Sequence, residues 1–560
     1  MKPLTRHTLH LTPLSPLHLG TGEDYEPTNY LITDGVLYAF DPARAILEPE
    51  QERELHAAAK SGNLQHIQRY FRKHPAPYAA VATHAATVSE DLTDEYKKKI
   101  GNTVQQEQNG NKVFNKFQIE RTTTNPQTHQ PYIPGSAIKG CFRTVLLENN
   151  SKQYSATEFK KQLTFIDNKG KTQNKNEKEQ SKIGEAFEKK LIGGEFEQDF
   201  MRLYKPSDLM PTNNLGTYII YAVNHEKDPE EAARDNSTIC VRREIIPHGK
   251  YRAFVGSITL QQLQLEHNPH LTDKTKDKLV AEKNRNPNLT ALALQSKNYY
   301  LPRFIKENKI LKERGLIDTK WLNDVQTLLD KLKTEIDSGK IILMRLGKNT
   351  GAENKTLKNF ANIKVKISQK EFEYLEESTT VWLASPKEKA YRDLLPFGWV
   401  LIEIDASGDN PALKNWCDNN SAHLKKAAEQ LAASAAKIAA AVAQSAAAAQ
   451  AAAAQAAAEQ AEAARLAALP AHERLAHDIL IRLSEHAKTY SDRNQEKNLQ
   501  LHRIILEELQ QAANNLDPAA RTQLADALAF PTLNAACKGF YSGKKEKEIK
   551  AALRQLRGEA

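Results

Sequence analysis

The stretch LSPLHLGTGEDYEPTNYLITDGVLYAFD, Leu14 to Asp41, sets short apolar runs between glycine-containing turns. Its second half predicts a β-hairpin, because Tyr30–Ile32 and Val36–Phe40 flank the turn Thr33-Asp34-Gly35. Just upstream, Thr8–Leu14 alternates apolar and polar residues, as a half-buried strand does. His18 to Gly22 must then be a loop between strands.

A helix is expected directly after this hairpin. Asp41 is suited to the N-cap and Pro42 to the first helical position, and Ala43–Ser61 carries a helical apolar pattern. Strands and a helix that alternate this early are typical of an α+β fold.

The rest of the first four hundred or so residues supplies material for two α/β domains in tandem. Helices are expected at Leu301–Ile317 and Trp321–Ile336. Further strands are expected at Val113–Glu120, Thr217–Val223, Ile239–Ile246, Arg252–Leu260, Ile341–Leu346 and Trp399–Ile404. Two stretches rich in Lys, Asn and Gln have too few apolar residues to fold alone and are expected to be mobile loops: Gly101–Lys112 and Asn168–Lys182.

The composition changes abruptly near the C-terminus. From His423 to Leu469 the chain is mostly alanine, which predicts a helix. We expect it to be soluble, because alanine gives little transfer energy and Gln, Glu, Lys and Ser interrupt the stretch. Pro470 ends it, and Ala471–Ala560 predicts a separate helical module with amphipathic helices such as Arg474–Tyr490 and Lys497–Asn514.

Charge and cysteine usage narrow the class of protein. The formal net charge is +9 and the pI about 9.0, which fits either a polyanionic partner or an indifferent basic surface. The four cysteines, Cys141, Cys240, Cys417 and Cys537, form no CxxC pair, so no zinc site and no cofactor is expected. Nothing at the N-terminus predicts a signal peptide, and we expect a cytoplasmic protein.

The run Pro134-Gly135-Ser136-Ala137-Ile138-Lys139-Gly140 is a glycine turn that leads into a helix, with Ser136 as its expected N-cap. Lys139 and Arg143 are four residues apart and so share a helix face that suits an RNA phosphate. A structural turn with solvated cations is the alternative. The run is not a phosphate-binding Walker loop, because its spacing before the lysine is wrong.

Two other glycine loops repeat the pattern. Gly20-Thr21-Gly22 allows a backbone to approach nucleic acid closely. Arg345-Leu346-Gly347-Lys348-Asn349-Thr350-Gly351 places two cations beside two glycines after a strand.

Catalytic readings of the chain have weaker support. A nuclease would need an acid–base residue near the RNA, for which His18, Asp24 and Asp34 are candidates. His18 also fits as a partner of its glycine loop, and Asp34 as an ordinary turn residue. Gly193-Gly194-Glu195-Phe196 spells a diguanylate cyclase signature but follows a helix-like segment, so this reading is rejected.

These segments together resemble the RAMP superfamily of CRISPR proteins, in order and spacing. The N-terminal stretch ending at Asp41 is most similar to the fifth subunit of type III-A (Csm) effector complexes. Tyr132–Thr144, Met201–Leu209, Arg345–Gly351 and Pro396–Val400 extend the resemblance. It covers about Lys2 to Asp405 and leaves out the alanine-rich helix and the C-terminal module.

The resemblance implies two ferredoxin-like (RRM-like) domains with glycine loops that hold the crRNA backbone. It implies a non-catalytic subunit at the crRNA 3′ end, whose partners are crRNA, the neighbouring backbone RAMP subunit, the small helical subunit and host nucleases, with no membrane. The expected domains are 1–215, 216–410, an alanine-rich linker 411–470 and a helical module 471–560. The expected RNA contacts are Gly20, Gly22, Gly135, Ser136, Lys139, Gly140, Arg143, Arg345, Gly347 and Lys348.

Two alternatives to this function stay open. One is a RAMP endoribonuclease that processes precursor crRNA, with His18 or a neighbour as acid–base. The other is a protein scaffold that recruits a subunit or nuclease through the helical tail.

Overall fold

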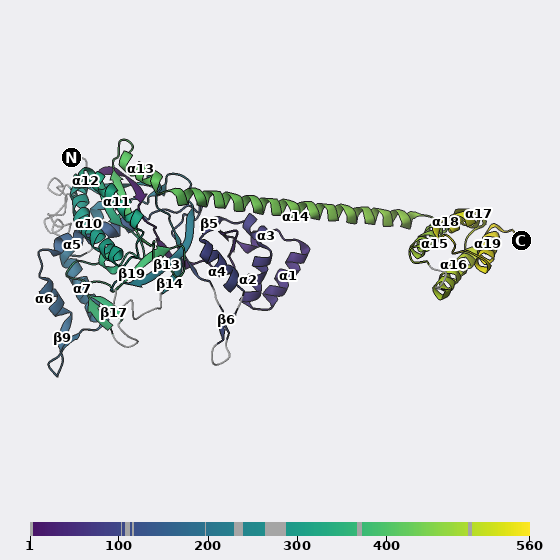
Figure 1. Ribbon diagram of the computed structural model, residues 1–560, viewed down its shortest axis with the longest axis horizontal. Helices are drawn as coiled ribbons and strands as arrows, with labels where there is room; N and C mark the ends of the chain where they lie inside the picture. Colours follow the sequence, from purple (N-terminus) through teal and green to yellow (C-terminus); the bar gives the residue numbers. More distant parts are fainter. Residues whose placement is uncertain are drawn as a thin grey trace, which may run out of the picture. The chain divides into compact units, whose positions relative to one another are not determined.

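The structure is a computed structural model that describes residues 4–101, 103–106, 112–114, 117–195, 198–228, 239–263, 287–366, 372–490 and 495–559. Its contacts divide the chain into two compact units, Met1–Ala443 and Gln444–Ala560. The first unit contains both strands and helices, whereas the second is helical (Figure 1). The expected α+β class with a helical tail is confirmed.

The first sheet of the first unit is organised around the N-terminal strand β1 (Leu4–Pro13). β1 pairs antiparallel with β15 (Phe254–Gln261) on one side and with β21 (Trp399–Ile404) on the other. β16 (Ile341–Arg345) extends the sheet beyond β21. The far edge consists of β11 (Tyr204–Pro206) and β12 (Met210–Pro211), both paired with β15.

The second sheet runs in the order β2, β8, β14, β13, β5, β4, β3. β13 also pairs with β19 (Thr380–Ser385), which pairs with β20 (Leu395–Pro396). The bounds of the other strands are β2 Gly20–Asp24, β3 Tyr30–Thr33, β4 Val36–Ala39, β5 His84–Val88, β8 Ile119–Thr122, β13 Thr217–Glu226 and β14 Cys240–Ile245. The hairpin expected around Asp34 is β3–β4, and its turn has the positive φ that Asp34-Gly35 tolerates.

Helices α5 (Gly135–Ser151) and α10 (Leu289–Glu313) pack against each other and against the first sheet. Their apolar faces join the sheet in one core that includes Phe142, Phe304 and Trp399. The helices α11 (Thr319–Lys331), α12 (Lys333–Asp337) and α13 (Pro411–Asn419) complete this layer. The core therefore holds segments from both ends of the first unit.

A group of short elements lies on the β3–β4 hairpin. Asp41 caps the 3-10 turn η1 as expected, accepting a hydrogen bond from the Ala43 amide, but the helix itself begins later, at Pro49. Tyr70, Phe71 and Tyr78 pack here against Phe40. The elements are η1 (Pro42–Arg44), α1 (Pro49–Lys60), α2 (Leu64–Lys73), α3 (Pro75–Ala80) and α4 (Glu90–Lys99).

An arm follows α5 and contains α6 (Ala156–Gln162), the β9–β10 hairpin (Thr164–Ile166 and Thr172–Asn174) and α7 (Glu177–Ile192). The expectation of a mobile loop at Asn168–Lys182 is therefore wrong, because much of this stretch forms β10 and α7. The Phe187 ring of α7 stacks on Phe360, and the Phe159 ring packs against both. The remaining elements are β6 (Thr103–Gln106), β7 (Lys112–Phe114), η3 (Phe200–Leu203), η5 (Ala352–Asn354), β17 (Ile363–Lys366) and β18 (Phe372–Leu375). The other stretch expected to be mobile, Gly101–Lys112, lies half outside the described residues.

The alanine-rich segment forms α14 (Ala422–Ala468). By length and composition it is apolar enough to cross a membrane, with a mean hydropathy of 1.3 over its most apolar window. Its first half is bonded to the first unit: Gln430 donates to the Gly35 carbonyl at 2.8 Å, and the Tyr38 hydroxyl donates to Ser434 at 2.7 Å. Lys437 pairs with Asp34.

The second unit packs its helices around a core of its own, which includes Ile479, Leu509, Leu524, Phe540 and Leu553. The helical module expected after Pro470 is confirmed, with α15 (Ala471–Ala487), α16 (Gln495–Asn515), α17 (Pro518–Ala527), α18 (Phe530–Ala536) and α19 (Lys544–Arg557).

The two-unit division at Ala443 is coarser than the domain boundaries expected from sequence. Both sheets take strands from either side of residue 215, since β1 pairs with β15 and β8 pairs with β14. The division at residue 215 stays a prediction, as do the linker 411–470 and the module boundary at 471.

Candidate nucleic-acid interface

The segment between β1 and β2 is buried and bonded on every side. The Leu14 amide donates to the Trp399 carbonyl at 2.8 Å, and Leu17 exchanges backbone hydrogen bonds with Ile246. His18 is fully buried, and its Nδ1 donates to the Glu244 carbonyl at 2.7 Å. The chain reaches the surface at Gly20, and Gly20 to Gly22 are all exposed.

The glycine loop after β16 lies directly against this segment. The Lys348 amide donates to the His18 carbonyl at 2.9 Å. A Cβ on Gly347, whose φ is +90°, would stand 2.4 Å from that same carbonyl oxygen. Only glycine allows the two backbones to come this close. The segment that leads from His18 to Gly20 therefore meets the loop of Gly347 and Lys348, and we call this contact the junction.

Glu120 of β8 is the electrostatic centre of the junction. Its carboxylate accepts hydrogen bonds from Arg243 and from Lys348, the latter at 2.7 Å, and lies 3.5 Å from His18 Nε2. The contacts with His18, Lys348 and Arg243 hold the pKa of Glu120 well below its usual range. Lys348 stays 53% exposed, so its ammonium can exchange Glu120 for a phosphate.

Helix α5 begins where the sequence indicated, but with a different cap. Pro134 occupies the N-cap position and Ser136 lies exposed within the first turn, so the expected N-cap role of Ser136 is wrong. The Gly135 amide donates to Asp208 Oδ1 at 2.8 Å, and a Cβ there would stand 2.6 Å from the Pro206 carbonyl oxygen. Gly135 therefore serves packing rather than RNA contact, since its amide is already bonded.

The face of α5 that carries Lys139 and Arg143 is partly exposed. Arg143 donates to Glu188 at 2.7 and 2.9 Å and to Asp199 at 2.7 Å. Burial alone would lower the pKa of Arg143, but these two carboxylates raise it. Lys139 forms no ion pair within the described ranges, and burial lowers the pKa of its ammonium while the nearby Asp199 opposes that effect.

The helix and the second glycine loop are linked through Cys141. Its thiol donates to the Arg345 carbonyl at 3.3 Å. Gly140, next to it, is exposed, and a Cβ at that position would meet no atom within 4 Å. All three glycine-bearing segments are thus connected, by the His18–Lys348 backbone bond and by the Cys141–Arg345 contact.

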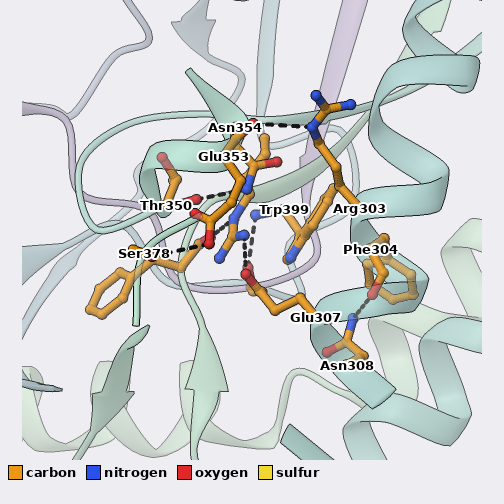
Figure 2. A network of polar contacts seen from close by, with 12 residues as sticks. Arg303, Phe304, Glu307, Asn308, Thr350, Glu353, Asn354, Ser378 and Trp399 are labelled. Carbon is orange, nitrogen blue, oxygen red and sulfur yellow. Dashed lines mark hydrogen bonds and ion pairs between the residues drawn. The ribbon is translucent and has the colours of Figure 1, made fainter. Parts of the chain in front are cut away.

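Arg345 is the sequence candidate that the structure moves away from the surface. Its side chain is 0% exposed, pairs with Glu307, donates to the Phe397 carbonyl at 2.8 Å and lies over the Trp399 ring. Figure 2 shows Glu307 and Trp399 within this buried network. The expectation that Arg345 contacts RNA is corrected: its role is to hold the loop.

The same network fixes the far end of the glycine loop. Asn354 donates to the Thr350 carbonyl at 2.8 Å, Arg303 donates to the Glu353 carbonyl at 3.1 Å, and Ser378 donates to the Glu353 carboxylate at 3.0 Å (Figure 2). A loop bonded at both ends presents its exposed residues in a fixed position.

Of the three residues considered for nuclease chemistry, His18 and Asp34 are engaged within the protein, and Asp24 is paired in register with Glu120. His18 is buried, and Asp34 pairs with Lys437 of α14. In the part of the chain that the structure describes, no group of three or more His, Cys, Asp or Glu residues is placed to hold a metal ion. Gly193 ends α7 in a left-handed conformation and so belongs to a helix end rather than a hairpin tip; Phe196 lies outside the described residues.

Sequence reasoning missed the acidic partners, namely Glu120, Glu188, Asp199 and Asp208. Only Asp208 lies in one of the short motif segments that carry the resemblance, and none of the four has a local pattern that distinguishes it from a solvated carboxylate.

The fold and this junction define an α+β protein whose glycine-bearing segments are bonded to one another, with exposed Lys348 and half-buried Lys139 among their residues. The family model of the RAMP superfamily matches residues 10–351. The chain belongs to the RAMP superfamily.

Two solved structures are similar at a greater distance. A chain of the "Csm-crRNA-target RNA ternary complex in type III-A CRISPR-Cas system" is 15% identical, with 71% of this chain and 100% of that chain covered and a TM-score of 0.37. Csm5 of T. onnurineus is 15% identical, with 70% and 99% covered and a TM-score of 0.40. A comparison with curated proteins gave no match.

Proposed function

We propose that this RAMP protein is a structural, crRNA-binding subunit of a type III-A CRISPR (Csm) effector complex that caps the crRNA 3′ end. The observation that carries the proposal is the linkage of the three glycine-bearing segments through the His18–Lys348 and Cys141–Arg345 contacts. Exposed glycines let an RNA backbone approach closely, and Lys139 and Lys348 supply cations. The N-terminal motif resemblance supports the choice of the Csm subunit within the superfamily.

The RNA contacts in this proposal divide by how available they are. Gly20, Gly22, Ser136, Gly140, Gly347, Lys139 and Lys348 contact the RNA backbone directly or permit its approach. Arg143 contacts phosphate after exchanging a carboxylate, because Glu188 and Asp199 hold its guanidinium in the free protein. Gly135 and Arg345 support the surface from behind.

The partners that follow are crRNA, the neighbouring backbone RAMP subunit, the small helical subunit and host nucleases that trim the guide, all in the cytoplasm. The bonds from the first half of α14 to Gly35 and Tyr38 favour a protein-bound helix over a membrane-spanning one. The nuclease alternative loses its named acid–base residue, since His18 has no exposed surface.

Co-purification of the full chain from its native cells, followed by sequencing of bound RNA, tests the proposal. We expect short repeat-tagged RNAs and other Csm-type subunits with the wild type, and loss of RNA in the Lys139→Ala, Lys348→Ala double variant. Lys309→Ala is the matched control, because Lys309 is exposed on α10 and pairs only within its own helix. Recovery of RNA that the double variant does not change would refute this site.

A further inference from the structure

The arm after α5 ends in an exposed hairpin with an unusual surface. Phe165 is 48% exposed and Ile166 74% exposed at the end of β9. In Figure 1 the hairpin projects from the first unit beyond α6. The described protein leaves about half of Phe165 and most of Ile166 uncovered, so the hairpin is a candidate contact surface.

The charge around these two side chains is strongly positive. Between Lys160 and Lys175 the chain carries five lysines and one acidic residue, Asp167. The Asp167 carboxylate is engaged, since it accepts hydrogen bonds from the backbone amides of Lys169 and Lys171, both at 2.9 Å. The ammonium groups of Lys161, Lys169 and Lys171 are exposed and have no ion pair in the ranges described.

The hairpin is nevertheless well supported at its base. Leu163 is buried, and its carbonyl accepts a hydrogen bond from the Lys175 amide at 2.9 Å. Lys160 pairs with Glu376, beyond β18, and the Phe159 ring packs on Phe187 at 4.6 Å between centroids. These contacts fix the base of the hairpin, so its tip stays exposed and does not fold back onto the first unit.

We propose that the β9–β10 hairpin is a second RNA contact, separate from the glycine-loop surface, where a base of single-stranded RNA stacks on Phe165 and phosphates bind Lys161, Lys169 and Lys171. The charge argues for this occupant, because an exposed aromatic side chain on a lysine-rich hairpin suits a single-stranded polyanion with exposed bases. The identity of the polyanion as RNA rests on the proposed function.

Binding of the full chain to a fluorescein-labelled oligouridylate of about 20 nucleotides tests the hairpin. Phe165→Ala is expected to weaken binding at least about fivefold, the effect of losing one stacked base, while Phe165→Tyr retains it. Leu499→Ala, at an exposed apolar position of α16, is the control and should bind as the wild type does.

Two further readouts separate stacking from charge. In Phe165→Trp, RNA should quench additional tryptophan fluorescence relative to the wild type. The triple change of Lys161, Lys169 and Lys171 to Ala should lower the slope of log affinity against log salt by about 2, since each phosphate on a single strand contributes about 0.7.

The outcomes distinguish the two proposals. Equal oligouridylate affinity of wild type and Phe165→Ala overturns the hairpin contact and leaves the glycine-loop site standing. Loss of co-purifying subunits in Phe165→Ala, with unchanged RNA affinity, also overturns it, because the hairpin would then bind protein. Absence of RNA from the wild-type chain purified from its own cells overturns the proposed function instead.

Discussion

Arg143 of α5 is held by Glu188 of α7, which accepts two hydrogen bonds from its guanidinium at 2.7 and 2.9 Å. The contact brings together the proposed phosphate-binding helix and the arm that carries the β9–β10 hairpin. A carboxylate that occupies the guanidinium competes with any phosphate that approaches it. RNA binding at this face must therefore break or remodel the Arg143–Glu188 pair.

Glu188→Gln should for this reason strengthen RNA binding, by about threefold to tenfold at low salt, because one competing charge is removed. Filter binding or fluorescence anisotropy with crRNA-length RNA measures the change. Glu185→Gln, on the same exposed helix but away from Arg143, should have a much smaller effect. If both variants bind alike, Glu188 does not compete with RNA.

Two glycines of α5 should respond to alanine in opposite ways. Gly140→Ala should stabilise the protein by about 0.5–1 kcal/mol, because the added methyl meets open space in a helix. Gly135→Ala should destabilise it by about 1–3 kcal/mol, since its Cβ would press on the Pro206 carbonyl. Urea denaturation gives both values. If Gly140 also approaches RNA, the more stable variant binds RNA more weakly, an effect that folding cannot explain.

Gly347→Ala should cost about 2–4 kcal/mol, because it combines a positive φ with a clash against the His18 carbonyl. Gly315→Ala separates the cost of the positive φ from the cost of the clash, because Gly315 has a φ of +67° and no atom lies within 4 Å of the added methyl. That control should lose only about 1–2 kcal/mol. Equal thermal stability of the two variants would mean that the His18–Gly347 approach adds nothing to the fold.

Acid should weaken the protein through Glu95. Its burial opposes ionisation, but bonds to Arg242, Lys99 and Tyr221 lower the pKa of Glu95 to about 2. A carboxyl whose folded pKa is lowered contributes stability that is complete above its unfolded pKa, about 4.3, and is lost as the pH falls towards 2. The difference in unfolding free energy between wild type and Glu95→Gln should shrink by about 2 kcal/mol between pH 6 and pH 3. A difference that stays constant over this range would contradict the prediction.

Truncation should show that α14 has two functions along its length. A chain ending at Ala443 keeps Gln430, Ser434 and Lys437. Its melting temperature should therefore be close to that of the first unit in the full-length protein. A chain ending at Ser421 loses these contacts and exposes part of the apolar cluster that lies on the β3–β4 hairpin. Its free energy of unfolding should be lower by about 3 kcal/mol. Calorimetry distinguishes the two. Equal melting temperatures would assign the whole helix to the tail.

Local structure was predictable where turn chemistry and periodicity agreed. The strand at Trp399–Ile404 and the hairpin around Asp34-Gly35 follow from patterns within a few residues. The cap of α5 was misjudged because both Pro134 and Ser136 suit a helix start, and the Asp208 contact that fixes the first amide comes from a distant loop. Contacts between residues far apart in the chain, such as this one, have no local sequence pattern from which they could be predicted.

The candidate site shows the same limit. The glycine loops were identifiable from spacing, but their convergence depends on bonds such as Lys348 to His18 that join distant segments. Arg345 looked like a surface cation beside glycines. Its strand is buried along its whole length, however, and the balancing Glu307 lies on α10, so its ion pair was not visible from sequence.

Because β1 lies between β15 and β21, its sheet can form only after both of these strands have been synthesised. β1 leaves the ribosome well before its two partners, which lie near residue 254 and near residue 399. At about 5–20 residues per second, that delay is tens of seconds, during which the edges of β1 stay open. A nascent chain thus completes the sheet around β1 only after nearly the whole first unit has been made. Until then chaperones or assembly partners must shield the open edges of β1.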